Sequence, residues 1–167
     1  ADRPIPFSAP MVRALQAGTK TQTRRILKNQ RAYDIDKCPY GQPGDRLWVR
    51  EAWRATGALD ELPPREVHPA SRIWYESDDS HQPGFGKLRP GMFMPRWASR
   101  ITLEVTGVRV ERLQDISETD AQAEGVIWEQ GQTATSVFES LWSDINGPES
   151  WNANPWVWVV EFKKVEV

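Results

Sequence analysis

The chain is organised around an eight-residue basic segment, Gly18-Thr19-Lys20-Thr21-Gln22-Thr23-Arg24-Arg25, here called the basic octet. Residues 3–33, which contain it, carry seven Lys or Arg and no Asp or Glu, whereas the whole chain has a net charge of −2. This contrast predicts a local anion-attracting surface on an otherwise acidic protein. The alternative is a solvated charged face, which is the ordinary role of a run of charges.

Two features of the octet favour a functional role. In an extended strand, Lys20 shares one face with Gln22 and Arg24, and the other face carries Thr21, Thr23 and Arg25. Gly18 follows a predicted helix and is suited to end it. A tight turn at this glycine would bring Lys20 round towards Thr23 and place an amine beside a hydroxyl.

Length and composition indicate a single globular domain. The chain has 167 residues, of which 39% are hydrophobic and 26% are charged. Its apolar runs are too short to cross a bilayer, so we expect no membrane association. The single cysteine, Cys38, excludes an internal disulfide and fits a reducing, cytoplasmic compartment. One Cys and two isolated His offer no metal-ligand spacing, so we expect neither a metal nor another cofactor.

Sequence periodicity predicts six strands with short helices between them. The strands are expected at residues 4–7, 20–27, 46–53, 72–76, 101–113 and 156–165. Three helices are expected to begin at N-caps and to end at glycines, namely Ser8 to Gly18, Ser117 to Gly125 and Thr135 to Gly147. Gly107 predicts a bulge where the sheet bends. The pattern favours an α+β fold with a curled sheet or small barrel, interrupted by irregular insertions near residues 55–71 and 80–94.

Four segments together resemble the ASCH domain. They are Gly18-x-Lys20-Thr21-x-Thr23-x-Arg25, Gly44-Asp45-x-Leu47-x-Val49-Arg50-Glu51, Thr102-x-Glu104-Val105-Thr106 and Val160-Glu161-Phe162. Residues 7–12 and 94–100 are also similar to the longer ASCH proteins of phages and prophages. The resemblance covers nearly the whole chain in the right order. It implies one ASCH domain over residues 1–167 with a PUA-like β-barrel fold, a class associated with RNA.

The resemblance also implies a catalytic group. Small bacterial ASCH proteins are amidohydrolases that remove the acetyl group of N4-acetylcytidine, and the positions matching their motif are Lys20, Thr23 and Glu104. Amide cleavage needs a nucleophile, a base and an acid. Thr23 would attack the acyl carbonyl, Lys20 would take its proton if burial makes the amine partly neutral, and Glu104 would hold the lysine or protonate the leaving amine. The alternative is a purely structural ion pair between Lys20 and Glu104.

A further set of residues is expected to bind substrate or nucleic acid, namely Thr21, Arg25, Arg50, Glu51, Arg96, Trp97 and Arg100. The four arginines suit phosphate or carbonyl contacts, with surface solvation as the alternative. Trp97 lies in a polar, proline-led segment and would stack on a base, a contact worth about 1–3 kcal/mol. Glu51 lies on the apolar side of its strand, so its carboxylate needs a partner, which we expect to be an arginine of the octet.

Three functions therefore fit the sequence. The first is a metal-independent amidohydrolase acting on N4-acylated cytidine or a related base, which predicts a closed pocket with the three catalytic groups in hydrogen-bond reach. The second is a non-catalytic module that binds RNA or a modified nucleotide in an open basic groove with salt-sensitive affinity. The third is a single-stranded RNA nuclease, an activity reported for some ASCH proteins. In each case the partner is RNA or a modified nucleoside, and the sequence predicts no oligomeric state.

Overall fold

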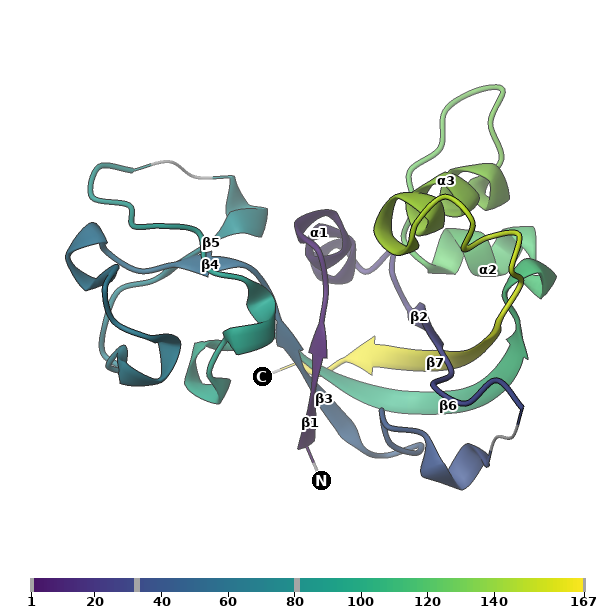
Figure 1. Cartoon of the computed structure of the whole chain (residues 1–167), viewed down its shortest axis with the longest axis horizontal. Helices are drawn as coiled ribbons and strands as arrows, with labels where there is room; N and C mark the ends of the chain where they lie inside the picture. The colour runs from purple at the N-terminus through teal and green to yellow at the C-terminus, as the bar shows by residue number, and fades with distance from the viewer. Residues whose placement is uncertain (1, 32–33, 80–81, 167) are drawn as a thin grey trace.

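The centre of the fold is a five-stranded mixed sheet, seen in the computed structural model, which describes residues 2–31, 34–79 and 82–166 (Figure 1). Its strand order is β1-β3-β6-β7-β2, with bounds Asp2–Pro6, Arg46–Arg50, Thr102–Arg112, Trp156–Lys164 and Gln22–Ile26 in that order. Strand β1 runs parallel to β3, and the other neighbours are antiparallel. The sheet is open, with β1 and β2 at its edges. An edge position suits the two prolines of β1, which donate no backbone hydrogen bond.

Strands β6 and β7 are the longest in the sheet, and β6 bends along its length (Figure 1). The pairing register between these strands shifts between Val105 and Gly107, which confirms the expected bulge. A bulge of this kind leaves one residue unpaired and increases the local twist. It therefore accounts for the curl of the sheet.

Three α-helices pack on this sheet: α1 spans Ala9–Ala17, α2 spans Glu118–Ala123 and α3 spans Ala134–Asn146. The expected ends at Gly18 and Gly147 are confirmed, and the Ser117 side chain accepts a hydrogen bond from the Asp120 amide as an N-cap. The expected cap at Thr135 is wrong. Thr133 caps α3, because it forms a reciprocal capping box with Ser136.

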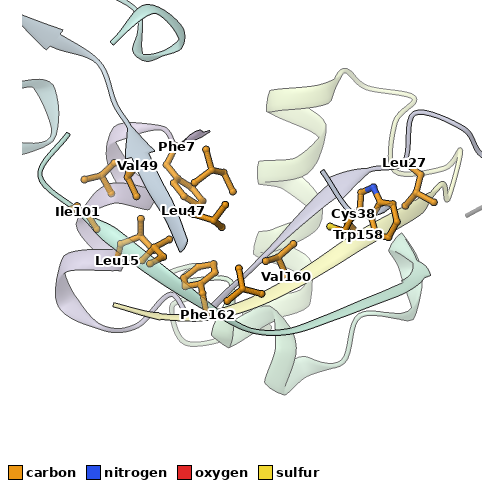
Figure 2. Packing of buried hydrophobic residues seen from close by; sticks show 14 residues of the cluster. Phe7, Leu15, Leu27, Cys38, Leu47, Val49, Ile101, Trp158, Val160 and Phe162 are labelled. Carbon is orange, nitrogen blue, oxygen red and sulfur yellow. The ribbon is translucent and has the colours of Figure 1, made fainter. Parts of the chain in front are cut away.

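Along β7, both faces of the sheet are covered. Strand β7 alternates, so that Trp158, Val160 and Phe162 enter a core formed with α1 and strands β1, β3 and β6. Figure 2 shows Val160 and Phe162 on the side of Leu15 and Leu47, whereas Trp158 lies beside Cys38 and Leu27 at the other end of the cluster. Val157 and Val159 point to the opposite face and pack against α2 and α3. This period-two alternation places helices on both sides of β7.

Residues 52–79 and 82–98 form a side lobe next to the sheet, at the left of Figure 1. Its regular structure is a two-stranded ribbon of β4 (Trp53–Arg54) and β5 (Trp74–Tyr75). The lobe has a small core of its own around Trp53, Val67 and Met94. The expected insertions near 55–71 and 80–94 fall in this lobe, where the described residues form short 3₁₀ helices and contribute to its core, and residues 80–81 lie outside the described part.

Short 3₁₀ helices complete the described elements: η1 (Ile35–Lys37), η2 (Gly57–Leu59), η3 (Pro64–Glu66), η4 (Glu76–Asp78), η5 (Gly91–Phe93), η6 (Arg96–Ala98) and η7 (Leu113–Asp115). The single strand expected over residues 46–53 is divided into β3 and β4, and the other five expected strands are present. The fold class is α+β, with a curled sheet and short helices around it, as the sequence predicts.

Candidate active site

A cavity of about 370 Å³ lies between the start of α1, strand β2 and helix α3. Part of its lining is polar and comes from Lys20, Thr23, Arg25 and Glu124. The rest is mainly apolar or aromatic, and includes Phe7, Met11, Tyr40, Leu141, Trp142 and Ile145. The cavity is lined by octet side chains at the edge strand β2 and by four other parts of the chain, namely residues 6–11, Tyr40, Glu124 and residues 138–146.

Two glycines position Lys20 in this cavity. Gly18 ends α1 in the left-handed conformation (φ 80°), and the amides of Thr19 and Lys20 then donate to the Ala14 carbonyl. At the end of α2, Gly125 also has a left-handed backbone (φ 90°), and a Cβ there would lie 2.8 Å from the Lys20 Cβ. This close approach is available only to glycine. It sets Lys20 directly beside the end of α2, and the two segments form an isolated bridge between Lys20 and Glu124.

Lys20 is a buried amine with a carboxylate partner. Its side chain is 2% exposed, and its Nζ donates to the Glu124 carbonyl oxygen at 2.9 Å and to Glu124 Oε1 at 3.2 Å. The Nζ atom also lies 5.6 Å from the centre of the Phe7 ring. Burial lowers the pKa of Lys20, and the Glu124 carboxylate only partly opposes that shift. The amine can therefore lose its proton more readily than an exposed lysine.

Glu124 is held from its other side by Arg24. Arg24 Nη1 donates to Glu124 Oε2 at 2.9 Å, while Nη2 reaches Glu111 Oε1 at 2.6 Å and Asp120 Oδ2 at 3.4 Å. Arg109 extends this network through Glu111, Asp120 and Glu161. Both carboxylate oxygens of Glu124 thus accept charge-assisted hydrogen bonds, which fixes the orientation of the group that holds Lys20.

Thr23 and Arg25 point to the opposite face of β2 from Arg24, as strand alternation requires. Arg25 donates from Nη2 to the Pro6 carbonyl at 2.7 Å and from Nε to Thr23 Oγ1 at 3.4 Å. Its guanidinium lies 5.0 Å from the Phe7 ring centre, and burial lowers the pKa of Arg25. Within the described part of the chain, Arg25 forms no salt bridge with a carboxylate. It therefore presents an unpaired positive charge beside the Thr23 hydroxyl.

The expected convergence of Glu104 on Lys20 is wrong. Glu104 lies on β6 between Leu103 and Val105, which point into the core shared with α1. Strand alternation therefore turns Glu104 to the other face of the sheet, where it forms a salt bridge of 3.2 Å with Lys163 on the neighbouring strand. The carboxylate beside Lys20 is Glu124, from the end of a helix rather than from a strand.

The expected partner of Glu51 is also different. Glu51 is 1% exposed and accepts two hydrogen bonds of 3.1 Å from Arg100, together with one of 2.8 Å from Ser77. The partner is not an octet arginine, and in the sheet β6 and β7 lie between β3, which precedes Glu51, and β2, which carries the octet arginines. Glu51 and Arg100 bind each other where the side lobe joins the sheet, and neither lines the cavity.

The remaining expected binding residues lie outside the cavity lining. The guanidinium groups of Arg50 and Arg96 lie 4.7 and 5.4 Å from the Trp48 ring centre. Trp97 packs edge-on against Trp53 in the core of the side lobe. Thr21 is exposed, and its backbone bonds to α2 and β7. Whether any of them contacts nucleic acid stays a prediction.

Sequence reasoning missed several cavity residues, namely Phe7, Tyr40, Glu124, Leu141 and Trp142. The sequence did contain a signal for Glu124, because this residue directly precedes Gly125, the glycine that was expected to end the second helix. The aromatic residues had none, since each reads as an ordinary core position.

Among the described residues, no group of three His, Cys, Asp or Glu side chains is arranged to hold a metal ion. The described helices are all too short or too polar to cross a membrane.

Comparisons with known proteins concern the fold. No family model matches the sequence, and no curated protein matches it. Among solved structures, the chain is similar to protein EF3133 from Enterococcus faecalis V583, of the family model DUF984, with 13% identity and a TM-score of 0.48, over 98% of this chain and 79% of that one. It is also similar to hypothetical protein PH0355, with 11% identity and a TM-score of 0.50, over 99% and 100% of the two chains. The second similarity shows a shared fold and nothing about activity.

Proposed function

We propose that the protein is an amidohydrolase that removes the acyl group from N4-acylated cytidine or a related modified nucleobase. The observation that carries this proposal is that one cavity is lined by a buried amine, a buried hydroxyl, a guanidinium and a buried carboxylate. Lys20 and Thr23 keep the roles that the resemblance implies, and Glu124 replaces Glu104 as the carboxylate.

The proposed reaction begins at the acyl group. Thr23 Oγ1 attacks the carbonyl carbon while its proton passes to the neutral form of Lys20 Nζ, which the lowered pKa of Lys20 makes more abundant. The C–N bond then breaks, and Lys20 returns the proton to the departing N4 amine. This leaves cytidine and an ester of Thr23. Water attacks the ester and gives its proton to Lys20, which passes it to Thr23 as the carboxylic acid leaves.

Two charged neighbours support these steps. Arg25 donates to Thr23 and forms no salt bridge in the described part of the chain, so its charge is available to the oxyanion that forms on the acyl oxygen. Glu124 holds Lys20 through its backbone carbonyl and its carboxylate, and Arg24 fixes that carboxylate in turn. Glu124 is therefore a positioning residue for the lysine rather than a group that reacts.

A second candidate is a module that binds a modified nucleotide without turnover. It is favoured by the two hydrogen bonds from Lys20 to Glu124, which stabilise the protonated amine and oppose its action as a base. Both candidates place the ligand in the same cavity, so the reaction itself must distinguish them.

The test is the release of acetate and cytidine from N4-acetylcytidine. We expect Thr23→Val and Lys20→Met to lower kcat/KM by about 10²–10⁴-fold, because the first removes the nucleophile and the second the base. Thr23→Ser keeps a hydroxyl and should retain much of the activity. A wild-type protein that binds the nucleoside but releases no acetate would support the binding module instead.

The matched controls are Glu124→Gln and Glu104→Gln, which remove one carboxylate charge each. Glu124→Gln should lower kcat/KM by about 10–100-fold, in line with a misplaced general base. It should also move the acid limb of the pH profile to lower pH, because the attraction that raises the pKa of Lys20 is gone. Glu104→Gln should stay within about twofold of wild type, since its partner is the exposed Lys163. The opposite ranking of the two variants would contradict the assignment of Glu124.

A further inference from the structure

A second hollow, here called the flanking groove, follows the far end of β2. Its volume is about 630 Å³, and it is lined by Ile26, Leu27, Lys28, Asn29, Asp34, Lys37, Pro39, Tyr40 and Trp158. Leu27 and Trp158 are buried and belong to the main core, whereas Lys28, Asn29 and Lys37 are exposed. The groove thus joins an apolar base to polar and charged sides.

The flanking groove and the cavity share a wall. Ile26 and Tyr40 line both hollows, so a ligand in the cavity that extends past these two residues enters the groove. The Arg25 guanidinium lies 6.0 Å from the Tyr40 ring centre, which places a positive charge at the junction. From Thr23 to Lys28 the chain advances by roughly 16 Å if it stays extended. Thr23 lines the cavity and Lys28 lines the groove, so a ligand that reaches both residues follows β2 over about this distance.

The charge of the groove favours an anion. Lys28 forms no salt bridge with another described residue, and Lys37 meets Asp34 at 4.0 Å with side chains that are 82% and 53% exposed. Such an exposed pair contributes little, so both ammonium groups remain available to a ligand. Asp34 is the opposing carboxylate in the lining, and two lysines outweigh it.

We propose that the flanking groove is a phosphate-binding subsite for the sugar–phosphate part of a nucleotide whose base occupies the cavity. This inference rests on the proposed ligand of the cavity, and it goes further by naming a phosphorylated substrate in place of a free nucleoside. Lys28 and Lys37 contact the phosphate, and Tyr40 separates it from the base. The phosphate belongs either to a mononucleotide or to the next position of a single strand.

The experiment measures equilibrium binding of cytidine, the cytidine monophosphates and a short oligocytidylate by calorimetry, between about 50 and 200 mM salt. For wild type, we expect phosphorylated ligands to bind roughly tenfold tighter than cytidine at the lower salt concentration. The double variant Lys28→Ala/Lys37→Ala should lose this gain and keep its affinity for cytidine within twofold. For the oligonucleotide, the slope of log K against log salt should become shallower by about 1.4, or roughly 0.7 per lost phosphate contact.

Two further variants sharpen this test. Lys87→Ala removes an exposed lysine from the side lobe and should change none of the affinities. Asp34→Asn can still cap η1 and removes the opposing charge, so it should tighten binding of the phosphorylated ligands. A gain with a monophosphate identifies a mononucleotide ligand, and a gain with the oligonucleotide alone identifies a strand.

Equal affinities for cytidine and its phosphorylated forms, or a double variant that behaves like Lys87→Ala, would overturn the subsite. Because binding is measured apart from turnover, the subsite can stand even where no acetate is released from N4-acetylcytidine. The converse result, turnover with no preference for phosphate, removes the subsite and leaves the amidohydrolase.

Discussion

Two ionic clusters in the described part of the chain, each built around a buried glutamate, differ in what surrounds them. The lobe cluster consists of Glu51, Ser77, Asp78 and Arg100, and it lies where the side lobe meets the sheet. The cavity cluster consists of Lys20, Arg24, Glu111, Asp120 and Glu124, and it lies along β2 and the end of α2. Both are built around a nearly inaccessible glutamate, Glu51 at 1% and Glu124 at 4% exposure.

The members of the lobe cluster bind one another. Arg100 donates from Nε and Nη2 to the two oxygens of Glu51 and from Nη1 to Asp78, and its guanidinium lies 3.8 Å from the Tyr75 ring centre. No member of this cluster lines the cavity. Arg13 of α1 also bonds to the backbone of Ser77, so the cluster fastens the lobe to the rest of the fold.

The cavity cluster has an open side. Lys20, Arg24 and Glu124 line the cavity, and the neighbouring Arg25 forms no salt bridge with a described carboxylate. A buried ion pair is by itself weak evidence of function, because purely structural networks contain such pairs too. What distinguishes the candidate active site from the structural cluster is therefore access to a hollow, together with a charge beside it that has no salt-bridge partner among the described residues.

The largest expected effect concerns the lobe cluster. Glu51→Ala leaves part of the Arg100 guanidinium and the Ser77 hydroxyl without their buried acceptor, so we expect a loss of about 3 kcal/mol in the free energy of unfolding. This lies at the lower end for a broken buried pair, since Arg100 keeps Asp78 and is 25% exposed. Urea denaturation measures the loss. Activity per folded molecule should stay within twofold of wild type.

Asp78→Asn provides the control for this change. Asp78 binds the same arginine, but its side chain is 41% exposed, so its removal should cost at most about 1 kcal/mol. If Glu51→Ala loses more activity than its unfolded fraction explains, the contrast between the two clusters is wrong. The lobe cluster would then be part of the active site.

A smaller effect on stability, with a larger one on activity, is expected at the glycine that supports Lys20. Gly125→Ala places a Cβ 2.8 Å from both the Ala14 Cβ and the Lys20 Cβ on a left-handed backbone, and we expect it to destabilise the protein by about 2 kcal/mol. Since Lys20 must shift, kcat should fall by about tenfold or more even where the protein is folded.

Gly131 supplies the matched comparison, because it lies in the same connection, has a similar φ of 87°, and a Cβ there would meet nothing within 4 Å. Gly131→Ala therefore carries only the backbone strain, about 1 kcal/mol, and should leave kcat unchanged. Equal kcat values for the two variants would show that the position of Lys20 does not depend on its packing against Gly125.

Much of the fold could be predicted because its signals are local. Glycines at 18, 107 and 147 mark a helix end, a bulge and a second helix end, and the residues around each give the same answer. Alternating apolar positions located the strands. The cap of α3 was missed by two residues because Thr133 and Thr135 are both good caps, and only the capping box with Ser136 decides between them.

Only those residues of the candidate site that lie close together in the sequence could be predicted. Lys20, Thr23 and Arg25 of the octet all line one cavity, and one strand and one turn determine where they lie. Their partners come from distant segments, with Glu124 lying 104 residues after Lys20 and Arg100 lying 49 residues after Glu51. No local pattern selects one distant carboxylate over another. The alternation of side chains along a strand would have argued against Glu104 as the partner of Lys20, because its neighbours Leu103 and Val105 both point into the core.

The smallest expected effect is on the pH dependence of stability. It tests whether burial in the cavity cluster lowers the pKa of Lys20 despite the nearby Glu124 carboxylate. Burial lowers the pKa of Lys20 below its ordinary value of 10.5, so between the lowered pKa and 10.5 the unfolded chain binds a proton that the folded protein has released. Stability must then rise with pH across that window. Lys20→Met removes this contribution, so its free energy of unfolding, measured by urea denaturation at several alkaline pH values, should rise less steeply than that of wild type. Parallel curves would mean that Glu124 fully compensates the burial of the amine, in which case Lys20 is an ordinary ion-pair partner and the two clusters are electrostatically alike.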